Sequence, residues 1–211
     1  MNMSNMHALI FTGGPSPSFD SPLPEASLII AADSGADNAE ELSLKVDLII
    51  GDFDSCSEGA IQKAKEARRF PRDKDVTDLE LALAAAIEKD IFSVTIITST
   101  RGRFDHTFGN IVVASSNRWR DLEIDLFVDD TYIKVIRDKT KLRGNPSDPV
   151  TLFAMGGTAY SITSKGLKWE LDGTDLTVGS GLGISNEFAA HEAEISIDEG
   201  TIISIQSLVS Y

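Results

Sequence analysis

The sequence has few cysteines, few basic residues and no long apolar run. Cys56 is the only cysteine, so no disulfide can form within the chain, and a reducing cytoplasm is the compartment we expect. No apolar run approaches the ~20 residues that a membrane-spanning helix needs. Residues 1–12 lack the basic and long apolar segments of a secretion signal. These absences argue against a disulfide-rich secreted protein and against an integral membrane protein.

Basic side chains are outnumbered by acidic ones. Lys and Arg total 19, Asp and Glu total 33, and the formal net charge is −14. Nucleic acids and anionic membrane surfaces both require clusters of basic residues, so we expect neither as a partner. An acidic protein suits a cationic substrate, and it would need a metal ion and a few local basic residues to handle an anionic nucleotide.

The chain up to about residue 130 alternates predicted strands and helices. Apolar runs predict strands at 7–12, 27–32, 47–50, 93–98, 123–128 and 131–137, and helices are expected at 36–42, 57–67, 77–89 and from Phe104 onward. Thr77 and Glu80 have the spacing of a capping box. Two apolar helix stripes are predicted: Leu79, Leu83, Ala86, Ile87, and Phe104, Phe108, Ile111, Val112. We therefore predict a three-layer α/β domain with a mostly parallel sheet over residues 1–138.

The pattern changes after residue 139. Residues 141–149 are rich in Gly, Pro and Asn and are typical of a linker. Short β-type runs follow at 150–154, 158–163, 167–171, 194–197 and 201–208, separated by Gly-rich turns. We predict a small all-β domain over residues 139–211, built as a sandwich or barrel.

Acidic residues follow the predicted strands of the first domain. Asp52 and Asp54 come directly after strand 47–50, Asp33 follows strand 27–32, and Asp78 begins helix 77–89. Ligands of parallel α/β sheets bind beyond the carboxyl ends of the strands, where these residues converge. Oxygen ligands from one or two carboxylates are what Mg²⁺ prefers. The alternative is that these residues only form turns and cap helices.

Two further side chains are candidates for ligand contacts. Arg103 lies between a predicted strand end and Asp105, and its guanidinium can hold phosphate oxygens with two parallel hydrogen bonds. We interpret Arg72 and Arg101 as solvated surface charges. Trp169 could offer a flat face to a ring or a cation, although a half-buried strand aromatic is the alternative.

An ordered set of motifs resembles the thiamine pyrophosphokinase (thiamine diphosphokinase) family. The motifs occur in the order of the family and span both predicted domains. One departure is Ser34, which stands where the family is expected to have Gly. The motifs are Ala32-Asp33-Ser34-Gly35-Ala36, Gly51-Asp52-Phe53-Asp54-Ser55, Asp75-Val76-Thr77-Asp78, Gly102-Arg103-Phe104-Asp105-His106 with Asn110, Gly166-Leu167-Lys168-Trp169, and Ile184-Ser185-Asn186-Glu187.

The resemblance implies transfer of a pyrophosphoryl group from ATP to the hydroxyl of thiamine, with Mg²⁺ required. It also implies a homodimer in which the carboxylates of one chain face the thiamine residues of the other. The proton acceptor stays open between Asp78 and Asp105. The resemblance implies that Asp52, Asp54 and Asp78 contact the metal and the phosphates, and that these three residues act in catalysis together with Arg103 and Asp105. It implies nucleotide contacts by Asp33, Asp75, Thr77 and Arg103. It implies thiamine contacts by Asp105, Trp169, Ser185 and Asn186.

Two other functions remain open at this point. The same catalytic domain could act on a different acceptor, such as a pterin alcohol. The acidic site could also belong to a module that senses a metal or nucleotide without turnover.

Overall fold

A computed structural model describes residues 6–18 and 21–207, and the chain divides into two compact units. The first comprises Met1–Val113 and Asp121–Asp129, and the second comprises Ala114–Arg120 and Asp130–Tyr211. The last boundary between the units, between Asp129 and Asp130, lies earlier in the chain than residues 138 and 139, where the linker-like composition suggested it. No helix within the described ranges is long and apolar enough to cross a membrane.

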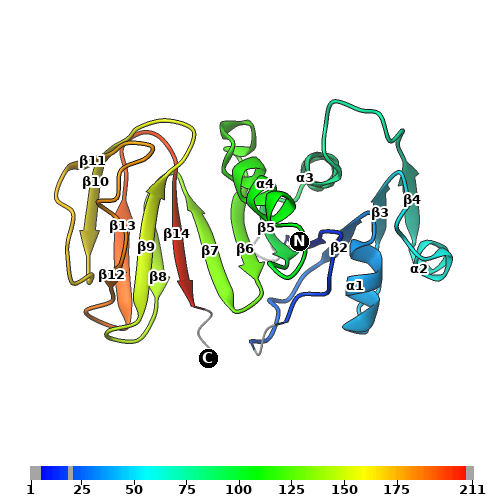
Figure 1. Ribbon diagram of the computed structural model, residues 1–211, viewed down its shortest axis with the longest axis horizontal. Coiled ribbons are helices and arrows are strands. Elements are labelled where there is room, and N and C mark those ends of the chain that lie inside the picture. The colour runs from blue at the N-terminus through cyan, green and yellow to red at the C-terminus, as the bar shows by residue number, and fades with distance from the viewer. Residues whose placement is uncertain (1–5, 19–20, 208–211) are drawn as a thin grey trace. The chain divides into compact units, whose positions relative to one another are not determined.

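The first unit is built on a parallel sheet (Figure 1). Its strands follow the order β4-β3-β2-β1-β5-β6, and each neighbouring pair runs parallel. The middle strands are apolar on both faces, as strands covered on both sides require, and Ile10, Ile30 and Ile96 are fully buried. The α/β class is thus confirmed, while three distinct layers stay a prediction. The strands are β1 (His7–Phe11), β2 (Leu28–Ala32), β3 (Leu48–Gly51), β4 (Glu66–Arg69), β5 (Ser93–Thr98) and β6 (Glu123–Val128).

A helix forms at each of the four predicted positions in this part of the chain. They are α1 (Gly35–Glu41), α2 (Glu58–Lys63), α3 (Asp78–Glu88) and α4 (Phe104–Ser115). Helix α3 begins at the predicted capping box, in which Thr77 accepts from the Glu80 amide and the Glu80 side chain accepts from the Thr77 amide. Both α1 and α3 pack against β1 and β2.

Three predictions about helices were wrong in part. The helix expected over 57–67 ends at Lys63, because Ala64 is extended, and the polar segment Glu66–Arg69 forms the edge strand β4. Apolar periodicity cannot reveal an edge strand made mostly of charged residues. The apolar stripe of α4 is not packed as expected: Phe104 is 72% exposed and Phe108 is 53% exposed. In α3, Ile87 is also exposed, and Ala82 and Ala85 are buried in its place.

The second unit contains two sets of antiparallel strands, as the all-β prediction requires. One set follows the order β12-β9-β14-β7 and the other follows β11-β10-β13-β8. Buried residues of both sets form one core, which includes Leu152, Ile162 and Ile195. The elements are a 3₁₀ helix, η2 (Asn117–Trp119), and β7 (Thr131–Ile136), β8 (Thr140–Arg143), β9 (Pro149–Ala154), β10 (Ala159–Lys165), β11 (Thr174–Leu176), β12 (Asn186–Glu187), β13 (Glu192–Ser196) and β14 (Ile202–Ser207).

Three details of this unit differ from the sequence-based expectation. Part of the linker-like stretch is strand β8, which pairs with β13. Strand 131–137, assigned to the first domain from the sequence, pairs with β14 as β7. Residues 167–171 do not form a strand and contribute one isolated bridge, from Leu167 to Phe188. Gly and Pro marked the turns correctly, but they could not tell which short runs would find a partner.

Candidate functional site

The loop after β3 is shaped by two residues with unusual backbone angles. Gly51 has a φ of +151°, and a Cβ there would lie 3.2 Å from the Cβ of Asp33, so a side chain at this position would be crowded. Phe53 has a φ of 65°, and its ring is buried under the Arg69 guanidinium, 5.0 Å from the ring centroid. The loop therefore turns around a buried aromatic ring, with Asp52 and Asp54 on either side of it.

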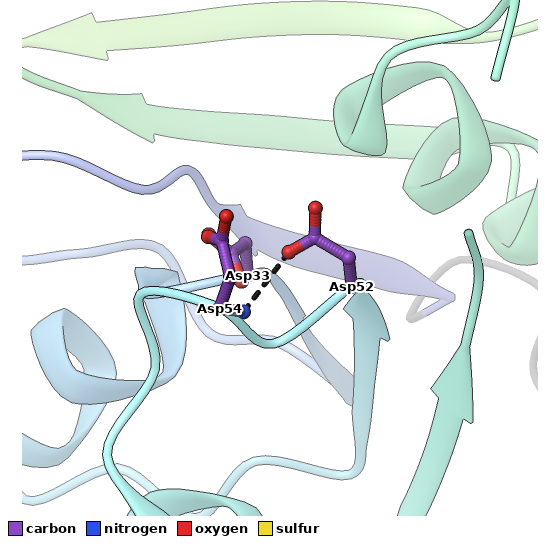
Figure 2. Close-up of side chains that lie close together, drawn as sticks. All are labelled: Asp33, Asp52 and Asp54. Atoms are coloured by element: carbon purple, nitrogen blue, oxygen red, sulfur yellow. Dashed lines mark hydrogen bonds between the residues drawn. The ribbon is translucent and has the colours of Figure 1, made fainter. Parts of the chain in front are cut away.

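Asp33, Asp52 and Asp54 form an acidic cluster (Figure 2). One carboxylate oxygen from each lies within 4.8 Å of the others. The Asp54 amide donates to Asp52 Oδ1 at 2.9 Å, which holds the loop closed. Asp33 accepts from the Ser55 hydroxyl through Oδ2, whereas its Oδ1 is buried and has no hydrogen-bonding partner. Three close negative charges and an unsatisfied buried oxygen favour a bound cation.

Asp78 lies nearby, in the first turn of α3. Its carboxylate pairs with Lys74, and Nζ and Oδ1 are 3.1 Å apart. Burial raises the pKa of Asp78, the Lys74 ammonium opposes that shift, and the negative charges of Asp33 and Asp52 add to it. Asp33, rather than Asp78, completes the cluster of closely spaced carboxylates in the described part of the chain. The predicted role of Asp78 as a metal ligand stays a prediction.

A cleft of about 790 Å³ lies in the first unit, beside this cluster. It is lined by residues from the loops after β1, β2, β3 and β5 and from the first turns of α3 and α4. Asp75 is exposed and is not among the described residues that line the cleft, so the structure does not bring it to the other nucleotide residues. The predicted site residues that do line it are Asp33, Asp52, Thr77, Asp78, Arg103 and Asp105.

Arg103 and Asp105 pair with each other across the start of α4. Arg103 Nε lies 3.2 Å from Asp105 Oδ1, and its Nη2 lies 2.5 Å from Oδ2. The hydrogen bond from Arg103 lowers the pKa of the Asp105 carboxyl. Both side chains are exposed to solvent, so the pair can open when an anion competes for the guanidinium.

The two other arginines are exposed, as the sequence suggested, and each also lies near an aspartate. Arg72 lines the cleft and lies 3.4 Å from the Asp54 carboxylate. Arg101 donates to the Ser16 carbonyl and lies 3.9 Å from Asp129, and its side chain is 55% exposed.

Sequence reasoning missed several small polar residues of the cleft. Gly13 and Gly14 line it together with Ser34 and Ser99. The Gly14 amide donates to Ser34 Oγ at 3.3 Å. Ser34 has an ordinary φ of −62°, so this departure from the family pattern causes no backbone strain. The Gly pair that follows the first strand was the sequence signal that could have predicted this part of the cleft.

Three of the four predicted thiamine residues, Trp169, Ser185 and Asn186, belong to the second unit, whereas Asp105 belongs to the first. Asn186 is buried, and its side chain accepts from the Trp169 amide at 3.1 Å and donates to the Trp169 carbonyl at 2.7 Å. This pair of bonds fixes the backbone of Trp169, whose side chain is 53% exposed. The Lys168 ammonium lies 4.5 Å from the centroid of the Trp169 ring. Ser185 is exposed beside Asn186 with a φ of 60°.

Family models match both units of the chain. Residues 19–126 match "Thiamin pyrophosphokinase, catalytic domain", and residues 137–202 match "Thiamin pyrophosphokinase, vitamin B1 binding domain". The chain belongs to the thiamin pyrophosphokinase family. The family predicted from the sequence motifs is therefore confirmed, and with it the class of enzyme, a thiamine diphosphokinase.

Relatives with this name match over most of their length. The thiamine pyrophosphokinase of Bacillus subtilis is 29% identical over 213 residues, which cover 94% of this chain and 97% of the relative. Thiamine pyrophosphokinase 1 of Arabidopsis thaliana is 25% identical and covers 94% of this chain and 85% of its own.

Solved structures of the family share the fold. The crystal structure of the Bacillus subtilis thiamine pyrophosphokinase superposes with a TM-score of 0.80 at 26% identity, covering 96% of this chain and 99% of that one. A thiamin pyrophosphokinase family protein from Enterococcus faecalis gives a TM-score of 0.80 at 26% identity, covering 98% of this chain and all of its own, 100%.

Proposed function

We propose that this protein transfers a pyrophosphoryl group from ATP to the hydroxyl group of thiamine and releases AMP. The observation that carries the proposal is the cleft of the first unit, which Asp33, Asp52 and Arg103 line beyond the ends of parallel strands. That unit is the one matched by the catalytic-domain model. Phosphoryl transfer depends mainly on positioning and on stabilising charge, which these groups provide.

Mg²⁺ is the metal that the acidic cluster fits. Its donors are all carboxylate oxygens, and one of them, Asp33 Oδ1, is buried without a partner. Asp33, Asp52 and Asp54 would hold the ion, and Asp78 adds a fourth carboxylate at the edge of the cleft. When bound, Mg²⁺ would neutralise charge on the phosphates of ATP.

The chain's own residues would then position the two substrates. Arg103 would exchange its bond to Asp105 for the phosphate oxygens of ATP, because a guanidinium binds both anions with the same planar geometry. The freed Asp105 carboxylate would face the cleft, as Asp78 does. Either carboxylate could accept the proton of the attacking hydroxyl.

Trp169 would bind the thiazolium ring of thiamine. The indole ring is exposed and already makes a cation–π contact with Lys168, which is the kind of contact that a cationic ring would make. Trp169→Ala should weaken thiamine binding about tenfold, with little effect on ATP binding. Calorimetric titration with each substrate measures both, and unchanged thiamine affinity in a stably folded variant would remove Trp169 from the site.

The decisive experiment for the function measures AMP formed from ATP. We expect AMP only when thiamine and Mg²⁺ are both present, and none after EDTA is added. AMP formation with a pterin alcohol but not with thiamine would support the alternative acceptor. ATP binding without any turnover would support a sensing module.

We further propose a two-fold homodimer with active sites shared between chains. Support comes from the apolar stripe of α4, where the exposed rings of Phe104 and Phe108 stack with centroids 6.0 Å apart. Exposed stripes of this kind are covered by partner chains, and two-fold dimers are the most common oligomers.

A complementation experiment tests the shared site. Asp52→Asn and Trp169→Ala are each purified as impaired proteins and mixed under conditions in which tagged subunits exchange. A heterodimer would place both lesions in one site and leave the other site intact, so activity should rise above that of either parent. Subunit exchange without any recovery of activity would show that each chain builds its own site.

A further inference from the structure

Asp129 accepts four hydrogen bonds at the end of β6, next to the cleft. Its Oδ1 accepts from the Ser18 amide at 3.1 Å and from the Ser99 hydroxyl at 2.9 Å. Its Oδ2 accepts from the Thr100 amide at 2.8 Å and from the Thr100 hydroxyl at 2.7 Å. The Arg101 side chain, 3.9 Å away, adds a positive charge. Each carboxylate oxygen therefore holds one backbone amide and one hydroxyl.

These bonds connect two loops that belong to the wall of the cleft. The loop after β1 contains Ser18 and contributes Gly13, Gly14 and Pro15 to the lining. The loop after β5 contains Ser99 and Thr100 and leads directly to Arg103. β1 and β5 are neighbours in the sheet, so their loops leave the same edge side by side.

The two loops also contact each other directly. A Cβ at Gly102 would lie 2.7 Å from Cδ of Pro15, so the loops approach too closely for a side chain at this position. Arg101 reaches across and donates to the Ser16 carbonyl. No described residue of either loop belongs to a helix or strand, so side-chain hydrogen bonds contribute to fixing the positions of the loops.

We propose that Asp129 is a positioning residue for the nucleotide: by tying these two loops together, it places Arg103 and the Gly13-Gly14 backbone where the phosphates of ATP bind. The inference rests on the proposed function for the identity of the ligand. Asp129 itself does not touch the substrate and acts only through the loops it holds.

A carboxylate can accept all four of these hydrogen bonds, whereas an amide cannot. Asn would keep one acceptor oxygen and turn the other into an NH₂ donor. The hydroxyls of Ser99 and Thr100 could rotate to accept from that donor, but a backbone amide cannot. In one orientation of the amide the Ser18 N–H would face a donor, and in the other the Thr100 N–H would. Either way one backbone amide loses its acceptor, and the connection between the two loops is weakened.

The test compares Asp129→Asn with Asp130→Asn in the full-length protein. Asp130 is the next residue, it is exposed, and its substitution changes the net charge by the same amount. ATP binding is measured by calorimetry without thiamine, well below the melting temperature of each variant, and the KM values for ATP and thiamine are measured separately. We expect Asp129→Asn to weaken ATP binding and raise its KM about tenfold, with the KM for thiamine changed less than about twofold.

Several outcomes would overturn the proposal. Unchanged ATP affinity in a folded Asp129→Asn protein would leave Asp129 with a purely structural role. An equal loss in Asp130→Asn would assign the effect to net charge, and an equal rise in both KM values would indicate general loosening of the fold. If Asp129→Asn does not fold, Thr100→Val removes one hydroxyl donor and should weaken ATP binding about threefold.

The same experiment separates this proposal from the proposed function. If the wild-type protein binds ATP but forms no AMP with thiamine, the proposed function fails while the ATP affinities still decide the role of Asp129. If the wild-type protein does not bind ATP, the positioning role fails as well.

Discussion

The acidic cluster and Asp129 lie at the same edge of the parallel sheet, and they differ in the groups that surround their carboxylates. In the acidic cluster, Asp33, Asp52 and Asp54 face one another, and a buried oxygen of Asp33 has no partner. Asp129, in contrast, is surrounded by donors. Burial alone would raise the pKa of its carboxyl, but the hydrogen bonds from Thr100, Ser18 and Ser99 lower it.

The difference lies in whether the protein itself fills the acceptor sites of the carboxylate. A carboxylate whose acceptor sites are filled by the protein is held in place and has little capacity for a ligand. A group of carboxylates with unfilled acceptor sites costs stability until a cation binds. The following predictions test that contrast, beginning with the largest expected effect.

Asp52→Asn should lower turnover by at least about a hundredfold at saturating Mg²⁺, because it removes charge from the cluster while keeping its shape. The variant should remain folded, since the Asn oxygen can still accept the bond from the Asp54 amide. Steady-state AMP formation and thermal melting measure the two effects, and Asp130→Asn is the control. Turnover near the wild-type value would remove Asp52 from the metal site.

Asp33→Asn and Asp129→Asn should change stability in opposite directions in metal-free buffer. Asp33→Asn relieves repulsion within the cluster, and Asn tolerates the left-handed φ of 51° at this position, so the free energy of unfolding should stay equal or rise. Asp129→Asn breaks a connected network and should lower it by about 1–3 kcal/mol. Urea unfolding at fixed pH measures both.

Mg²⁺ sharpens the same comparison. The ion should raise the melting temperature of the wild-type protein and of Asp129→Asn, and it should raise that of Asp33→Asn less. Destabilisation of similar size in the two metal-free variants would contradict the contrast between the two sets of carboxylates.

The smallest predicted effect concerns a titratable residue at the opposite end of the sheet. His7 begins β1, and its ring contacts the hydroxyls of Ser93 and Thr95 at 2.9 and 3.1 Å. Burial lowers its pKa, although the charges of Asp125 and Glu123 oppose that shift. Because the unfolded chain then binds a proton more readily, stability due to His7 is lost as the pH falls from about 6.5 toward the lowered pKa.

Replacing His7 with a residue that does not titrate should make the melting temperature depend less on pH. Relative to His7→Gln, the wild-type melting temperature should fall by about 2 °C more between pH ~7.5 and pH ~5, while AMP formation at neutral pH should be the same in both proteins. Parallel melting curves for the two proteins across this range would show that His7 does not contribute.

Most strands and helices could be predicted because their residues carry local signals. The buried apolar runs of β1, β2 and β5 and the capping box of α3 identify those elements directly. The same signals failed where the environment, rather than the residue type, decided the outcome. The charged edge strand β4 has no apolar pattern. Phe104 and Phe108 fit the apolar stripe of a helix, but both residues are exposed.

The candidate site was predictable in composition but less so in arrangement. The residues after β2 and β3 supplied Asp33, Asp52 and Asp54 as candidates, since parallel strands end at one edge. Which carboxylates lie close enough to share an ion depends on distances of a few ångströms, and the close group contains Asp33 with Asp52 and Asp54. Asn186, predicted to bind thiamine, uses its amide to hold Trp169.

The sequence by itself determined the family, the two-part architecture and the chemical types at the site, because these depend on residue identity and order along the chain. Tertiary structure alone decided the partner of each polar group. Arg101 and Asp129 lie 28 positions apart in the chain and meet only because β5 and β6 are adjacent. Hydrogen bonds act over about 3 Å, so their pattern follows from folded positions that no local sequence signal contains.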